Sequence, residues 1–202
     1  DDEIIDHLNF LLMAAHDTTT SALTTMIWAL AQYPEWQDAV RAEVMAVGSD
    51  QLSYDDLDKL ELTERVLKEA LRYRPPVPFL PRYAEHSFEF GGYEIPGETS
   101  VTVSPGLVAM DPAWWTHPGR FDPDRFSDNR AEDRGHRFAW TPFGGGAHKC
   151  IGMHFAIMQV RAFLHQFLQQ FQIALPVSYQ DRWQAIPIPK PKDGLPVILS
   201  RF

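Results

Sequence analysis

The sequence has little cysteine, no excess of positive charge and no long apolar run. One cysteine, Cys150, in 202 residues rules out an internal disulfide but leaves the compartment open. A formal net charge of −9 argues against nucleic acid as a partner, because phosphate binding needs a basic surface. The apolar run at residues 8–15 is too short to span a bilayer. These absences predict an acidic globular protein.

The sequence also lacks an initiating methionine and a basic leader, since it begins Asp1-Asp2-Glu3. We therefore expect a piece of a longer protein, folded as a single domain over residues 1–202. The chain is long enough for a hydrophobic core and shows neither repeats nor a disordered composition. We expect a cytoplasmic monomer; any membrane anchor of the longer protein would precede residue 1.

Apolar residues recur at helical spacing in four stretches. The first predicted helix, residues 1–33, is buried and carries a polar interruption at residues 16–21, where Thr and Asp compete for backbone hydrogen bonds. Ser53 and Asp56 have the spacing of a capping box that opens a helical stretch. The other predicted helices are a second from Pro34 to about Gly48, a third that ends at Pro75-Pro76, and a central buried one over residues 151–171.

Alternating apolar residues predict strands elsewhere. Residues 88–103, with a turn at Gly91-Gly92, predict a small antiparallel sheet, and residues 171–199 predict short strands around an Asp193-Gly194 turn. Residues 111–146 are rich in Pro, Gly and aromatic residues and predict a packed, irregular segment. The fold class is mainly α with small β-sheets (α+β).

The sharpest motif is Phe143-Gly-Gly-Gly-Ala-His-Lys-Cys150-Ile-Gly152, directly before the last predicted helix. A cysteine entering a helix N-terminus gains from the helix dipole, and N–H groups of a glycine-rich loop can point at its sulfur. Both effects stabilise a thiolate. A thiolate is an axial ligand of haem iron, and glycines let a loop approach a flat macrocycle closely.

Two other interpretations of Cys150 are open from the residues alone. A lone cysteine is often a small buried apolar residue. His148, Cys150 and His154 are also zinc-ligand types, although structural zinc usually takes four ligands and paired cysteines.

The motif resembles the haem loop of the cytochrome P450 family, F-x-x-G-x-[HR]-x-C-x-G, at every fixed position. The resemblance implies the C-terminal portion of the P450 fold, with haem b as cofactor and Cys150 as its iron ligand. It also implies two propionate ligands, His148 in the loop and Arg82 in a strand, because propionates need strong donors. The further haem-contacting residues implied are Phe143, Gly144, Gly146, Gly152 and Ala14.

Glu69-Ala-Leu-Arg72 has the E-x-x-R form of the same family, and the spacing places both side chains on one helix face. Pro123-Asp124-Arg125-Phe126 resembles the family's P-E-R-F segment, with Asp124 in place of Glu. The resemblance implies that Glu69, Arg72 and Arg125 form a network that supports folding and haem seating and takes no part in catalysis.

The first predicted helix contains Ala14-Ala-His-Asp17-Thr18-Thr, which resembles the family's oxygen-binding groove with Ala15 in place of a glycine. The resemblance implies that Thr18 hydrogen-bonds dioxygen and that Asp17 relays protons to it. The alternative is a threonine cluster that only bends the helix. By the same resemblance Val77, Phe79, Ile186 and Pro187 line the substrate pocket; the alternative is that they pack in the core.

The implied reaction is insertion of one oxygen atom from O2 into a lipophilic small molecule. A ferredoxin or a flavodoxin-type NADPH reductase would supply the electrons. One alternative is a haem-thiolate peroxygenase that uses H2O2. The presence of Asp17 and Thr18 argues against it, because only O2 activation needs their proton relay. A second alternative is a non-catalytic haem-binding fragment.

Basic residues gather just before and within the glycine-rich loop: Arg130, Arg134, His136, Arg137 and Lys149. A basic patch on an acidic protein would suit docking of an acidic electron donor. The alternative is a solvated loop whose arginines pair with Glu132 and Asp133.

Overall fold

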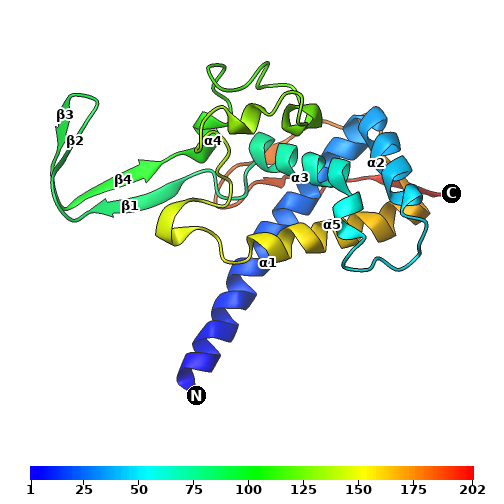
Figure 1. Cartoon of the computed structure of the whole chain (residues 1–202), viewed down its shortest axis with the longest axis horizontal. Helices are drawn as coiled ribbons and strands as arrows, with labels where there is room; N and C mark the ends of the chain where they lie inside the picture. The colour runs from blue at the N-terminus through cyan, green and yellow to red at the C-terminus, as the bar shows by residue number, and fades with distance from the viewer.

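The structure is a computed structural model that describes all 202 residues, and helices dominate it (Figure 1). The α-helices are α1 (Asp2–Gln32), α2 (Pro34–Ala46), α3 (Glu61–Tyr73), α4 (Pro105–Val108) and α5 (Met153–Gln170). Short 3-10 turns are η1 (Leu57–Lys59), η2 (Pro123–Phe126), η3 (Glu132–Arg134) and η4 (Gly146–His148). None of the helices is both long and apolar enough to cross a bilayer.

The strands form four separate two-stranded antiparallel sheets. They pair β1 (Leu80–Ala84) with β4 (Thr99–Val103), β2 (Phe88–Phe90) with β3 (Tyr93–Ile95), β5 (Phe171–Ala174) with β8 (Ile198–Arg201), and β6 (Trp183–Gln184) with β7 (Lys190–Pro191). The predicted class, mainly α with small sheets, is confirmed.

The hydrophobic core lies where α3 contacts α1, α2 and α5 (Figure 1). Met26 and Leu30 of α1, Val40 of α2 and Leu164 of α5 are fully buried in it. The N-terminal half of α1 extends beyond the rest of the molecule in Figure 1, and residues 1–13 are exposed. The prediction that this helix is buried is therefore wrong for its first half, because nothing within residues 1–202 packs on it.

The prediction of one long helix is confirmed, since α1 runs unbroken through the polar residues 16–21. The hydroxyls of Thr18 and Thr20 donate to the carbonyl oxygens of Ala14 and His16, each at 2.8 Å. These bonds satisfy the polar side chains within the helix, so they do not compete with its backbone.

The capping box forms but opens only a turn and η1, where a helix was predicted. Ser53 N–H donates to the Asp56 carboxylate at 3.0 Å, and Asp56 N–H donates to the Ser53 hydroxyl at 3.3 Å. The N-terminus of α3 is capped instead by Glu43 of α2, which accepts from Thr63 N–H at 2.9 Å. This cap comes from 20 residues away, so no local motif shows it.

The hairpin at Gly91-Gly92 forms as predicted, joining β2 to β3. Residues 99–103 do not extend that sheet; they pair with β1, so residues 80–103 make two sheets and not one. Residues 111–146 are irregular, and Trp115, Phe126 and Ala139 form a small apolar cluster within them. That segment is therefore a packed coil, as predicted.

Helix α5 is less buried than predicted. Val160, Leu164 and Leu168 form one buried stripe at helical spacing, whereas Phe155 is 60% exposed and Ile151, just before the helix, is 92% exposed. Outside that stripe, Ile157 and Phe167 are partly buried against the core, whereas Phe155 and Phe163 stay exposed.

Candidate functional site

The glycine-rich loop is closed by one backbone hydrogen bond, from Cys150 N–H to the Phe143 carbonyl oxygen at 2.9 Å. Gly144 and Gly146 have φ of +71° and +66°, a left-handed conformation that glycine adopts without steric cost. The turn η4 begins at Gly146 and ends two residues before Cys150. These features fix the position of Cys150 at the end of the loop.

The Cys150 thiol is free and exposed, and no hydrogen bond of the chain reaches its sulfur. Helix α5 begins at Met153, so the cysteine precedes the helix and does not enter it. The prediction that loop N–H groups donate to the sulfur is therefore wrong for this arrangement. The backbone N–H groups of Ile151 and Gly152, however, donate to no backbone carbonyl. Gly152 also lies close to the sulfur, since a Cβ built on it would be 3.9 Å from Sγ of Cys150.

The structure gathers no group of three or more His, Cys, Asp or Glu side chains that could hold a metal. His148 and His154 therefore do not complete a zinc site with Cys150, since structural zinc takes four ligands. One thiolate on an open loop suits a metal that already carries its other ligands, as haem iron does. The donor set of this loop thus fits haem.

Exposed apolar side chains agree with that fit. The predicted pocket residues Val77, Phe79 and Ile186 are 38%, 46% and 68% exposed, and Pro187 is exposed too. The core-packing alternative therefore fails within this chain. An apolar macrocycle and an apolar ligand are the kinds of molecule that such surfaces bury favourably.

The predicted groove lies in α1, where burial begins. Ala14 and Thr18 are half-buried, and Asp17 is exposed. The Thr18 hydroxyl is held by the Ala14 carbonyl, and a carboxylate oxygen of Asp17 lies 2.8 Å from Nδ1 of His16. His16 was not singled out from the sequence, although its position next to Asp17 was the available signal.

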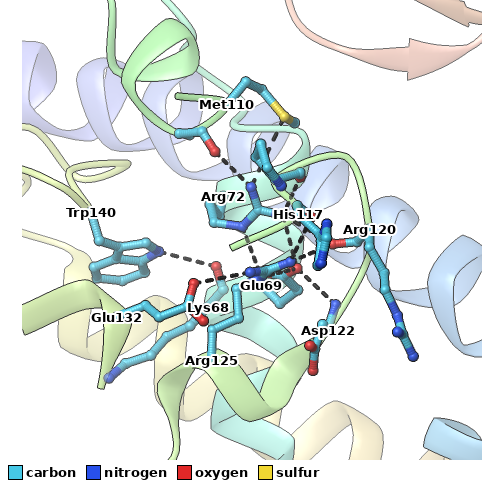
Figure 2. Close-up of polar contacts among 12 residues, drawn as sticks. Lys68, Glu69, Arg72, Met110, His117, Arg120, Asp122, Arg125, Glu132 and Trp140 are labelled. Carbon is cyan, nitrogen blue, oxygen red and sulfur yellow. Dashed lines mark hydrogen bonds and ion pairs between the residues drawn. The ribbon is translucent and has the colours of Figure 1, made fainter. Parts of the chain in front are cut away.

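Glu69 and Arg72 of α3 meet Arg125 of η2 (Figure 2). All three side chains are fully buried. Arg72 donates to both carboxylate oxygens of Glu69, at 2.7 and 2.9 Å, and Arg125 donates to one of them at 3.0 Å. The N–H of Asp122 donates to the same oxygen at 2.8 Å. We name Glu69, Arg72 and Arg125 the ion cluster.

The remaining donors of the ion cluster find backbone carbonyls. Arg72 donates to Ala109 and Pro118, and Arg125 donates to Thr116, His117 and Arg120, all between 2.5 and 3.0 Å. Every charge in the cluster is therefore paired or hydrogen-bonded, which offsets the cost of burying it.

Glu132, predicted only as a partner for the arginines of the basic patch, extends the ion cluster. Its carboxylate accepts from Arg125 at 3.0 Å (Figure 2). It also pairs with Arg130. Burial by itself raises the pKa of Glu132, but hydrogen bonds from Arg130 and from Thr116 N–H and the charge of Arg125 hold it below its ordinary value. Asp124, where the family motif has Glu, points outward and pairs with Arg65 at 3.0 Å.

Comparison with known proteins agrees with the loop and the cluster. The family model for cytochrome P450 matches residues 1–194. The chain belongs to the cytochrome P450 family. At the level of the family this is the chemistry of haem-thiolate monooxygenases.

Individual relatives agree. Cytochrome P450 136 of Mycobacterium tuberculosis is 42% identical over 200 residues, which cover 98% of this chain and 41% of that protein. The sterol 14alpha-demethylase of Mycolicibacterium vanbaalenii is 34% identical over 85% of this chain and 39% of its own length. Cyanobacterial CYP120A1 with bound retinoic acid matches in structure with a TM-score of 0.91 and 32% identity, over 96% of this chain and 45% of that one.

The resemblance to P450s and the P450 fold are thus confirmed. The chain spans less than half the length of these relatives.

Two other predicted haem contacts of this P450 chain, Arg82 and His148, lie exposed on β1 and in the loop. Arg82 donates to the carbonyl of Pro81 at 2.8 Å and has no carboxylate partner. Its other donors remain available to an anion such as a propionate.

The predicted basic patch is smaller than its sequence suggests. Arg130 pairs with Asp122 at 2.7 Å and with Glu132, and Arg134 pairs with Asp128 at 3.0 Å. Only the pair of Arg130 with Glu132 follows the predicted alternative, whereas Asp133 pairs with Lys68 and with no arginine.

Two cations of the patch stay without an acidic partner. Arg137 and Lys149 line a pocket of about 220 Å³ beside the loop, together with Phe138, Phe143 and Met153. Arg137 also stacks 4.4 Å from the centre of the Phe138 ring. The usable positive charge therefore lies at these two residues.

Proposed function

We propose that residues 1–202 form the haem-binding, C-terminal domain of a P450 monooxygenase, with haem b held by the Cys150 thiolate. The observation that carries the proposal is the closed loop, which presents the sole cysteine exposed and free of any partner. His148 and Arg82 would bind the propionates. Phe143, Gly144, Gly146, Gly152 and Ala14 would contact the macrocycle.

Haem, once bound, supplies the activation of O2. The chain would supply protons and positioning. The Thr18 hydroxyl can turn from the Ala14 carbonyl, where it now donates, towards a ligand beside α1. Asp17 is exposed and contacts His16, so it can exchange protons with solvent and pass them towards Thr18.

The substrate class proposed is a lipophilic small molecule, oxidised with electrons from a ferredoxin or a flavodoxin-type NADPH reductase. Val77, Phe79, Ile186 and Pro187 would line its pocket and exclude water. Two matched proteins have names that mention a sterol and retinoic acid, which are lipophilic compounds. Those names support the class and not a particular substrate.

Isotope labelling of the full-length protein tests the reaction. With sterols, retinoic acid and lauric acid as probes, an electron donor and 18O2, we expect one labelled oxygen atom in a product. Label entering only from labelled H2O2 would show the peroxygenase alternative. Haem binding without product from any probe under either condition would favour the non-catalytic alternative.

A further inference from the structure

The hairpin β6–β7 is fastened to the helices by side chains outside the proposed site. Pro189, the residue just before the second strand, is held by Ser21 of α1, whose hydroxyl donates to the Pro189 carbonyl oxygen at 2.7 Å. Ser21 is 4% exposed and Pro189 is buried, so water does not compete for this bond.

The first strand is fastened by Asp181 and Arg74. The Asp181 carboxylate accepts from Arg74 at 2.6 Å and from the indole N–H of Trp183 at 2.5 Å. The Arg74 guanidinium contacts the rings of both Trp28 and Trp183, 3.9 and 4.0 Å from their centres. The two rings are nearly perpendicular, at 81°, so the cation sits in the corner between them, and its pairing with a carboxylate further restricts its orientation.

These two fastenings place the tip of the hairpin relative to Thr18. Ser21 follows Thr18 by three residues, so both side chains lie on one face of α1, about one turn apart. Ile186 lies between the two fastened strands and is 68% exposed. A shift of either strand would therefore move Ile186 relative to the Thr18 turn.

We infer that Ser21, Arg74 and Asp181 are positioning residues that fix the hairpin tip against the Thr18 turn and so limit the size of apolar ligand that fits there. The inference rests on the proposed function for the site, but the fastening itself does not depend on haem.

Hydrogen exchange of the backbone amides in residues 183–191 tests the fastening, with or without haem. Ser21→Ala and Asp181→Ala should each speed exchange by about fivefold to tenfold, the effect expected from loss of one or two hydrogen bonds in a local opening. Thr24→Ala is the control for Ser21, because the Thr24 hydroxyl donates only within α1. Asp128→Ala, at a surface pair with Arg134, is the control for Asp181. Equal exchange in variants and controls would overturn the inference.

Ligand size tests the consequence in the haem-loaded, full-length protein. If the tip limits ligand size, optical titration with 4-phenylimidazole should show an affinity change of about fivefold in Ser21→Ala, whereas the smaller imidazole should change less than about twofold. Equal changes for both probes, or none, would overturn the role in ligand fit. Failure of the unmodified protein to bind haem would instead contradict the proposed function, and hydrogen exchange would still decide the fastening.

Discussion

The ion cluster and the cysteine loop contain the residues that the sequence marks most clearly, yet they differ in completeness. Glu69, Arg72 and Arg125 are fully buried, and each finds its partners within residues 1–202. Cys150 is exposed, and its sulfur has no partner at all. A buried ion cluster needs all of its partners within the fold, whereas a thiol that binds a cofactor must stay accessible to that cofactor.

The largest effect should come from removing a member of the ion cluster. Glu69→Ala removes the only carboxylate between two buried guanidinium groups, so we expect a loss of about 3–5 kcal/mol in the free energy of unfolding. Urea unfolding measures it. Glu61→Ala, at an exposed acid in the first turn of the same helix, should lose less than about 1 kcal/mol. Equal losses would mean that the ion cluster supports nothing.

Replacing Thr18 of α1 should change the turnover of the protein and not its stability. Thr18→Ala should leave haem content unchanged but lower product formed per NAD(P)H by about tenfold or more, with H2O2 released, because a positioned proton donor contributes about 10² to 10⁴ in rate. Thr20→Ala is a matched control, since its hydroxyl makes the same kind of bond within α1. Tight coupling in Thr18→Ala would remove Thr18 from proton delivery.

A smaller effect should separate the two arginines of the basic patch. Arg137→Glu should slow first-electron transfer by about threefold to tenfold at low salt, because its charge is unpaired. Arg134→Glu should change it less, because Asp128 already neutralises Arg134. Stopped-flow reduction at several ionic strengths compares them. If neither the rate nor its salt dependence changes, the electron donor docks elsewhere.

The smallest effect on stability should appear at acid pH, at Glu132, which extends the ion cluster. The pKa of Glu132 in the folded protein is below its ordinary value of 4.5, so the unfolded chain takes up the proton first as pH falls. The stability from this group is complete above about pH 4.5 and is lost as pH falls through the folded pKa. Glu132→Gln should remove this loss, as measured by urea unfolding between about pH 3 and 6. Parallel pH profiles of the two proteins would contradict it.

Local patterns were enough to predict the four long helices but not the turn at η1 or the short α4. The ranges of α2 and α5 and the hairpin at Gly91-Gly92 follow from periodicity and glycine alone. The pairing of β1 with β4 and the capping of α3 by Glu43 do not, because both join residues far apart in the chain.

The candidate site was predictable to a similar extent. Spacing indicates that Glu69 and Arg72 face each other, but the contribution of Glu132 depends on how an irregular loop folds back. Burial of α1 and α5 was overestimated because an apolar pattern shows what a helix can bury and not whether a partner is present.

The most direct test of the haem-thiolate proposal is the carbon monoxide difference spectrum of the reduced, full-length protein. We expect the red-shifted band of a thiolate-ligated haem, its loss in Cys150→Ser, and its retention in His154→Ala. A spectrum that is unchanged in Cys150→Ser, or that lacks the band in the unmodified protein, would contradict ligation by Cys150.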